Sequence, residues 1–394
     1  MKQKLSQFKK ILPLLLICAA CGPKLPPREQ SLIAAIPQAP VTLDPRLAAD
    51  AEGQKIAALL YDGLVRFDNQ QRPQPLLAES WEEVEPLKFR FTLKKGVKFS
   101  NGAELTSKDV ACTYDFIKDP KNASFQRSEF AKIKSLSIID DLHFDLVLSE
   151  PYAPFFLLLK KGIVHCDGKS GTGLYTLESQ KAGRRVVLKR NPHSLRTQPR
   201  LQYLVFEIVK DDSTRVLKLL NKEVDLVLNG IPPVLIQKVL EKEHLRMMRG
   251  PGTTFAYMGL NLRDPILRNL QVRQALAYAL DPSAVIQHMW LGFAARADSL
   301  LSPTHWAYHS PTTQIQTDLQ KAKALLDQAG FPDPDGDGPQ SRFKLVFKTS
   351  TVKERVEIAK LLSHQLRAVG IDAQVQPNEW GTFFRDVQSG NFQI

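Results

Sequence analysis

The sequence predicts an α/β fold with more than one lobe. Several short segments alternate between apolar and polar side chains, which is the pattern of half-buried strands. Between them lie segments in which apolar residues recur every three or four positions, as they do on one face of a helix. The chain has 394 residues, which is more than one hydrophobic core usually serves, so we expect at least two lobes.

The first 21 residues predict an export signal. Four lysines precede a short apolar stretch, Ile11 to Ala20, which is too short for a membrane-spanning helix. Small residues then precede Cys21, and this arrangement resembles a bacterial lipoprotein signal, in which the cysteine is lipidated and begins the mature protein. Cys18 stands where such signals usually carry leucine. A plain secreted protein that is cut nearby is the alternative.

Residues 22–30 are rich in proline and charge, which favours an extended tether between a lipid and the folded part. The formal net charge is +12, and four of the positive charges lie in the leader. No block of five like charges occurs, so we interpret the basic balance as a solvated surface near a membrane and expect no nucleic acid partner. Export also argues against a transcription factor or a cytosolic metabolic enzyme.

The first half of the folded part alternates between predicted strands and helices. Strand patterns occur at 88–94, 142–148 and 204–208, and Asn101-Gly102 follows the first of them as a turn signal. A helix is expected to begin at Thr106 and another at Asp211, because each stands where a capping residue precedes an apolar face.

The second half predicts two amphipathic helices and then a strand–helix–strand unit. The helices cover 267–280 and 319–329, with Gly330 placed as a helix-ending residue. Strand patterns at 343–347 and 371–375 flank a helical pattern at 358–369. Short joins of this kind predict a βαβ unit, so we expect these two strands to be parallel.

Two cysteines, Cys112 and Cys166, lie outside the leader. An oxidising compartment permits a disulfide between them. The sequence alone does not show that their Cα atoms come close enough for a bridge. We therefore expect two separate thiols, with a disulfide as the alternative.

The motifs indicate neither an enzyme nor a metal protein. The sequence has no G-x-S-x-G elbow and no H-E-x-x-H motif, and we expect no cofactor. Residues 333–338 resemble the start of a calcium loop, but Lys344 stands where that loop needs glutamate, so a polar turn is expected. His305 and His309 are spaced like a metal pair, but flanking prolines favour a loop. The glycines at 171 and 173 favour a tight turn or hinge over a phosphate site.

A series of short motifs, each weak alone, follows one another in a recognisable order from about Leu32 to the last residue. They are Thr42-Leu43-Asp44-Pro45, Tyr61-Asp62-Gly63-Leu64-Val65, Leu77-Ala78-Glu79-Ser80-Trp81, residues 91–102, Asn261, residues 272–276, Ala279-Leu280-Asp281, residues 322–330 and Glu379-Trp380. In this order they resemble the bacterial extracellular solute-binding proteins of family 5, the oligopeptide, dipeptide and nickel receptors of ABC importers.

The resemblance implies a two-lobed periplasmic-binding-protein-like fold of type II, in the large class with an extra domain. Lobe one would hold residues 31–58 and 172–260, the extra domain 59–171, and lobe two 261–394. The family continues beyond the point that corresponds to Ile394, so we expect lobe two to be incomplete. Two further departures are Leu174, where the family usually has proline, and a shortened stretch between Pro151 and Gly171.

The resemblance also implies that the protein binds a ligand and catalyses no reaction. The protein would capture peptides between two closing lobes and deliver them to an ABC permease and ATPase complex. It would act as a monomer in the periplasm or at the outer cell surface, held to the membrane by a lipid on Cys21. Alternative ligands are nickel chelates, haem and oligosaccharides. A chaperone-like lipoprotein and a surface hydrolase are the other classes.

Large amphipathic side chains are the candidates for lining a ligand pocket, although each suits a hydrophobic core equally well. We expect ligand-binding roles for a set made up of aromatic residues and one asparagine: Tyr61, Tyr175, Tyr257, Asn261, Trp306 and Trp380.

Overall fold

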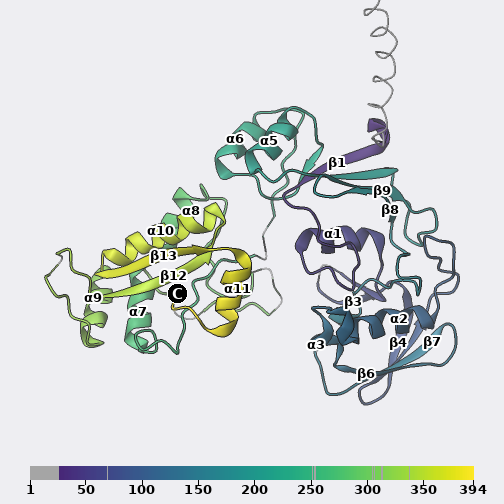
Figure 1. The fold of residues 1–394 in the computed structure, drawn as a ribbon, viewed down its shortest axis with the longest axis horizontal. Helices are drawn as coiled ribbons and strands as arrows, with labels where there is room; N and C mark the ends of the chain where they lie inside the picture. Colours follow the sequence, from purple (N-terminus) through teal and green to yellow (C-terminus); the bar gives the residue numbers. More distant parts are fainter. Residues whose placement is uncertain are drawn as a thin grey trace, which may run out of the picture. The chain divides into compact units, whose positions relative to one another are not determined.

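The structure is a computed structural model that describes residues 26–394 except 69, 251, 253, 304, 306, 312, 313 and 337. It confirms the α/β fold and divides the chain into two compact units, Met1–Pro232 and Pro233–Ile394 (Figure 1). The predicted signal peptide with Cys21 lies outside the described residues. Within the described part, no helix is both long enough and apolar enough to span a bilayer.

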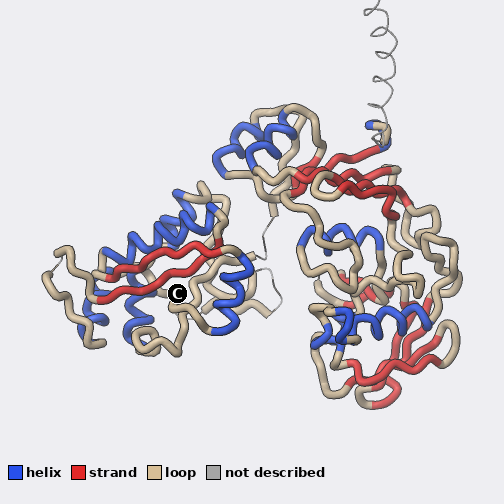
Figure 2. Tube along the Cα trace, in the orientation of Figure 1, coloured by secondary structure: helices blue, strands red, loops and turns tan. Residues whose placement is uncertain are grey.

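The first unit contains a five-stranded mixed sheet in the order β11-β1-β10-β9-β8. β1 pairs in parallel with β10 and β11, whereas β9 pairs antiparallel with both β8 and β10. Strands are drawn in red in Figure 2. The strands are β1 (Ser31–Ile36), β8 (Tyr175–Lys181), β9 (Arg185–Arg190), β10 (Tyr203–Ile208) and β11 (Leu226–Val227). The strand that the alternation predicts at 204–208 is β10.

Two helices and one short turn accompany this sheet. They are η1 (Arg28–Gln30), α1 (Ala51–Leu60) and α5 (Asp212–Leu220). Asp50 caps α1 and Asp211 caps α5, because each carboxylate accepts a hydrogen bond from a backbone N–H of the first turn. Ile56 and Leu60 of α1 pack against Phe206 of β10 and Leu188 of β9 in one buried cluster.

A second sheet of the same unit has four antiparallel strands in the order β4-β5-β7-β6, and a two-stranded β2–β3 ribbon lies in the same unit. The strand patterns predicted at 88–94 and 142–148 are β5 and β7. The bounds are β2 (Val65–Phe67), β3 (Pro73–Pro75), β4 (Ala78–Glu85), β5 (Lys88–Leu93), β6 (Ile133–Ile138) and β7 (His143–Leu148).

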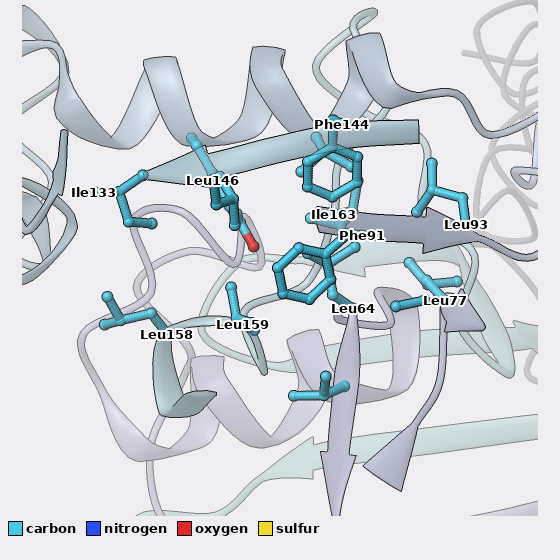
Figure 3. Close-up of a cluster of buried hydrophobic side chains, with 14 of the residues drawn as sticks. Leu64, Leu77, Phe91, Leu93, Ile133, Phe144, Leu146, Leu158, Leu159 and Ile163 are labelled. Carbon is cyan, nitrogen blue, oxygen red and sulfur yellow. The ribbon is translucent and has the colours of Figure 1, made fainter. Parts of the chain in front are cut away.

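A core of aromatic and aliphatic side chains fills the space under this sheet (Figure 3). Phe91 of β5 and Phe144 of β7 stack with ring centroids 5.4 Å apart, and both are fully buried. Such a pair adds to the free energy that burial alone supplies. Short helices close the core: α2 (Ser107–Lys118), η2 (Pro120–Asn122), α3 (Arg127–Phe130) and α4 (Phe155–Leu158).

The helix predicted to begin at Thr106 is α2. The Asp109 carboxylate accepts hydrogen bonds from the backbone N–H of Thr106 at 2.9 Å and from its hydroxyl at 3.0 Å. These bonds cap the N-terminus of α2 and form a capping box.

Cys112 and Cys166 form a disulfide, with their Cα atoms 5.7 Å apart, so our expectation of two separate thiols was wrong. The reason lies in tertiary contacts that no local pattern reveals. The Thr113 hydroxyl both donates to the carbonyl and accepts from the N–H of Val164, at 3.0 Å each, which holds residues 164–166 against α2. The bridge closes a loop of 54 residues. In the chain-entropy description such a loop stabilises the fold by about 4 kcal/mol.

The second unit contains the predicted βαβ unit. β12 (Phe343–Ser350) and β13 (Ile371–Asn378) pair in parallel, joined by α10 (Lys353–Arg367). Leu366 of α10 and Val272 of the helix predicted at 267–280 lie in the same buried cluster. The remaining helices are α6 (Pro233–Leu240), α7 (Leu270–Ala279), α8 (Pro282–His288), α9 (Leu319–Gln328) and α11 (Trp380–Ser389).

The last residues of the sequence lie along the second edge of β12. The Lys348 N–H donates to the carbonyl of Ile394 at 2.9 Å, and the Ile394 N–H donates to the carbonyl of Val346 at 3.2 Å. This is the pattern of a parallel strand pair. Ile394 is itself buried in the core of the unit.

Candidate functional site

The predicted ligand-binding residues fall into two groups. Tyr61 and Tyr175 belong to the first unit, whereas Tyr257, Asn261 and Trp380 belong to the second. Trp306, the sixth, lies outside the described residues.

Tyr61 and Tyr175 line the same pocket, which has a volume of about 390 Å³. Tyr61 ends α1 and Tyr175 begins β8. The Tyr175 side chain is almost fully buried, and its hydroxyl donates to the carbonyl of Leu201 at 3.1 Å. Leu43 and Leu60 contribute further buried apolar surface to the pocket.

Gly171 lines this pocket, and neither Gly171 nor the nearby Gly173 has space for a side chain. A Cβ on Gly171 would lie 2.2 Å from the carbonyl oxygen of Leu60, and one on Gly173 would lie 2.4 Å from that of Leu59. The Gly173 N–H donates to the carbonyl of Leu60 at 3.0 Å. The tight turn predicted from these glycines is not present at 171–173, where the backbone has only a bend at Gly173. Glycine is needed here because two backbone segments approach each other closely.

The segment before these glycines is held by Asp167. Its carboxylate accepts from the backbone N–H groups of Lys169 at 2.8 Å and Ser170 at 3.0 Å, from the Ser170 hydroxyl at 2.8 Å, and from the Asn101 amide at 3.1 Å. Nδ1 of His165 lies 3.2 Å from the same carboxylate. Burial alone would raise the pKa of Asp167, but these hydrogen bonds to the charged form outweigh it and hold the pKa well below its ordinary value.

Tyr61 is fixed by its hydroxyl, which donates to the carbonyl of Lys169 at 2.9 Å. Burial, with the neighbouring Asp44 carboxylate, raises the pKa of Tyr61 to about 12, so its phenol is neutral at physiological pH. The Asp44 carboxylate binds the Arg46 guanidinium through two of its nitrogens, with the shortest contact at 2.6 Å. This pairing occupies Arg46 and compensates the charge of Asp44 at the edge of the pocket.

Asn261 in the second unit forms hydrogen bonds with residues near the end of the described chain. Its amide nitrogen donates to the carbonyls of Gly390 at 3.0 Å and Phe392 at 2.7 Å. Its amide oxygen accepts from the backbone N–H of Arg263 at 3.1 Å. Since both amide N–H bonds are used inside the unit, a contribution of Asn261 to ligand binding would be made by positioning. That role stays a prediction.

Trp380 and Tyr257 have exposed rings. Trp380 begins α11, is 53 % exposed, and packs against Phe383 and Phe384 with ring centroids 5.8 and 5.9 Å away. Tyr257 is 78 % exposed and lies against Phe255. Exposed rings of this size are available to a ligand, and the binding roles of both residues stay predictions.

Sequence reasoning missed the polar residues of the first-unit pocket. Ser100, Lys169 and Thr176 line it together with Asp44 and the partly exposed Leu177. Asp44 and Ser100 belong to the motifs that carry the family resemblance, so they were visible in the sequence. Lys169 had no signal of its own, because its place depends on contacts made by Asp167 and Tyr61.

The structure offers no ready metal site among the residues that it describes, since these include no group of three His, Cys, Asp or Glu side chains suited to hold an ion. The Asp333 carboxylate, the first residue of the calcium-like stretch, accepts from the backbone N–H groups of Asp335 and Gly336, as in a polar turn. Asp337 of this stretch lies outside the described residues.

Comparison with known proteins gives a consistent result. A sequence model described as bacterial extracellular solute-binding proteins, family 5 middle, matches residues 72–394. The dipeptide-binding protein of Escherichia coli K12 is 28 % identical over 377 residues, which are 85 % of this chain and 69 % of that protein. The heme-binding protein A of Haemophilus influenzae is 26 % identical, over 90 % of this chain and 71 % of its own length.

Solved structures share the fold. NikZ from Campylobacter jejuni in complex with Ni(L-His) matches with a TM-score of 0.78 and 26 % identity, over 91 % of this chain and 75 % of that one. AppA from Bacillus subtilis in complex with a nonapeptide matches with a TM-score of 0.76 over 90 % of this chain and 76 % of that one. At 23 % identity, the second match speaks for the fold alone.

The Asp167 contacts predict a pH-dependent loss of stability in Asp167→Asn. A lowered pKa means that the ionised carboxylate stabilises the fold above the ordinary value of 3.8, and that this contribution is lost as pH falls below it. Because the side chain is 36 % exposed, we expect a modest cost of about 1 kcal/mol at pH 7. Thermal unfolding at pH 7 and at pH 2–3 measures the effect.

The variant should unfold at a lower temperature than the wild type at pH 7, and the gap should narrow in acid. Glu178→Gln, which changes an exposed carboxylate on β8, is the matched control and should unfold like the wild type at both pH values. An equal gap at both pH values would show that the charge of Asp167 is not the cause.

Proposed function

Because this chain belongs to the bacterial extracellular solute-binding proteins of family 5, we propose that it captures peptides outside the cytoplasm for an ABC importer. The observation that carries this proposal is the match to a dipeptide-binding protein over 85 % of the chain. The oligopeptide-binding protein AppA of Bacillus subtilis supports it, with 24 % identity over 90 % of the chain. The family consists of binding receptors, which agrees with the lack of catalytic motifs in the sequence.

The binding residues of this proposal are those that the sequence singled out. Trp380 and Tyr257 present exposed rings, as aromatic contacts to a peptide require. Peptide receptors gain affinity from hydrogen bonds to the ligand backbone and from water in a wide pocket. Capture between two closing lobes stays a prediction of the family resemblance.

A nickel chelate is the second candidate ligand, favoured by the match to NikZ bound to Ni(L-His). In that complex histidine accompanies the metal. A receptor for such a chelate therefore has less need of a metal site of its own, so the lack of a three-residue cluster in the described chain does not decide against it. Haem is a further alternative, supported by the heme-binding relative.

The cellular setting follows the same proposal. Family membership places the protein outside the cytoplasm. We propose a monomer that is tethered to the membrane by a lipid on Cys21 and that passes its ligand to a permease and ATPase complex. The tether and the lipid derive from the pattern of the first 30 residues, and the monomeric state derives from the family resemblance.

Peptide binding predicts a rise in the melting temperature of the protein in the presence of di- to pentapeptides. A ligand present at 100 times its dissociation constant stabilises the folded state by about 2.7 kcal/mol. Trp380→Ala should weaken binding about 10-fold, as the loss of an aromatic anchor does. Phe125→Ala, which removes another half-exposed ring, should leave binding unchanged.

A shift with nickel–histidine or haem, and none with peptides, would replace the peptide proposal with one of the alternatives. A peptide shift that Trp380→Ala leaves intact would confirm the ligand and remove Trp380 from its site.

The lipid proposal predicts that Cys21→Ser releases the exported protein from membranes, because the acceptor thiol is lost. Cell fractionation measures this directly. Cys18→Ser, three residues earlier in the same leader, is the control and should stay in the membrane fraction. Equal membrane retention of both variants would contradict lipidation at Cys21.

A further inference from the structure

We propose that one end of the five-stranded sheet, where the chain enters β1, is a docking surface for anionic lipid headgroups. We call this end the tether-side rim, and it comprises residues 28–31, 189–190, 200–203 and 222–225. The inference rests on the tether proposed above, because it concerns the membrane to which that tether would hold the protein.

The sequence of this sheet is unusually basic over one stretch. The longest part of the folded chain without an acidic residue runs from Ser179 to Phe206, through most of β8, all of β9 and the start of β10. Seven basic side chains lie in it: Lys181, Arg184, Arg185, Lys189, Arg190, Arg196 and Arg200. A surface of cations without interspersed acids attracts anionic partners.

Backbone contacts across the sheet place some of these cations beside the start of β1. The Gln202 N–H donates to the carbonyl of Gln30 at 3.0 Å, and the Arg190 N–H donates to the carbonyl of Gln202 at 2.8 Å. On the other side of β1, the Arg28 guanidinium donates to the carbonyl of Lys222 at 2.9 Å. Because neighbouring strands lie about 4.8 Å apart, Arg190 and Lys222 lie on either side of the entering chain, each within about 10 Å of it.

Four cations of the rim have no ion-pair partner among the residues that the structure describes. They are Lys189, Arg190, Arg200 and Lys222. Lys189 is partly buried, and the other three residues are exposed. The Arg190 guanidinium also donates to the carbonyl of Pro199 at 3.2 Å, which holds the loop that leads to Arg200. Cations without a partner in the fold are available to an external anionic surface.

The acidic side chains of the rim are fewer, and two of the three are paired. Asp225 binds Arg28 at 2.7 Å, and Glu223 binds Lys218 at 2.9 Å. Glu29 is exposed and forms no ion pair within the described part of the chain. The unpaired cations outnumber this acid, so the rim is positive and complementary to anionic headgroups.

The proposed tether brings this rim within reach of a bilayer. Residues 22–30 span at most about 30 Å when fully extended, and they lead directly into the rim. Cations close to an anionic surface add to binding, and the attraction falls off over about 10 Å at 0.1 M salt. The tether supplies the attachment, and the rim determines which end of the first unit faces the membrane.

The test uses the chain from Cys21 onward, coupled through the Cys21 thiol to a maleimide lipid in vesicles. Cys112 and Cys166 form a disulfide, so Cys21 is the thiol that reacts. This chemical tether makes the result independent of lipidation in the cell. The vesicles contain phosphatidylcholine alone or mixed with phosphatidylglycerol. A lipid with a photoactivatable diazirine headgroup labels the protein surface that it touches, and mass spectrometry identifies the labelled segments.

We expect labelling of residues 189–202 to be at least about 5-fold stronger on vesicles with phosphatidylglycerol than on phosphatidylcholine alone. Raising the salt to about 1 M should remove the difference, because the screening length falls to about 3 Å. The β8–β9 turn is the internal control. The Ile208 N–H donates to the carbonyl of Arg184 at 2.9 Å, which places this turn at the opposite end of β10 from Gln202, so it should be labelled weakly on both vesicles.

Two triple variants remove the same charge from opposite ends of the sheet. Lys189→Gln/Arg190→Gln/Arg200→Gln should lose the extra labelling of residues 189–202 that phosphatidylglycerol produces. Lys181→Gln/Arg184→Gln/Arg185→Gln is the matched control and should keep it. The double variant Lys189→Gln/Arg200→Gln retains the hydrogen bond from Arg190 to Pro199, so it keeps the test valid if the triple variant disturbs the loop. Melting temperatures establish that each variant is folded.

Labelling of residues 189–202 that is equal on both kinds of vesicle, or equally strong in the folded rim variants and the wild type, would overturn the proposal. Stronger labelling of the β8–β9 turn than of the rim would overturn it too, because another end of the sheet would then face the membrane. Such results would leave the proposed peptide binding and the lipid on Cys21 untouched, since melting temperatures with peptides and cell fractionation test those separately.

Discussion

The close approach of residues 171–173 to the end of α1 is the constraint on which the first unit depends. The chain returns here from the four-stranded sheet and enters β8 of the five-stranded sheet. Its backbone lies against the carbonyls of Leu59 and Leu60, where a side chain would meet backbone atoms at less than 2.6 Å. Only glycine fits, and the contact sets where Tyr61 and Tyr175 lie with respect to each other. The pocket is a consequence of that contact.

The contacts around Gly171 and Gly173 also explain how a loop, rather than a helix or strand, can line the pocket. Asp167 closes the turn before them, and the disulfide holds the preceding residues to α2. Thr113 and Val164 add two hydrogen bonds at the same place. The segment is therefore held at several points although it belongs to no sheet, as a preorganised binding surface needs.

Much of the fold could be predicted from the sequence, because periodicity is a local property. The alternation at 343–347 and 371–375, with a helical face between, identified a parallel βαβ unit that the structure contains. The disulfide could not be predicted, since it depends on how α2 packs against a segment 54 residues away. Asn261 shows why individual site residues are harder to predict than the fold. Its place in a family motif suggested a contact with the ligand, but its amide nitrogen donates to the carbonyls of Gly390 and Phe392 within the same unit.

The most direct test of this account is the thermal unfolding of Gly171→Ala beside Gly250→Ala. Gly250 has open space around its Cα and an ordinary backbone conformation, so alanine there should leave the melting temperature unchanged. Alanine at 171 must displace the Leu60 carbonyl, and we expect a loss of about 2 kcal/mol or more, seen as a clearly lower melting temperature. A Gly171→Ala protein as stable as the control would show that the two segments have room to separate, and would contradict the close approach as the basis of this unit.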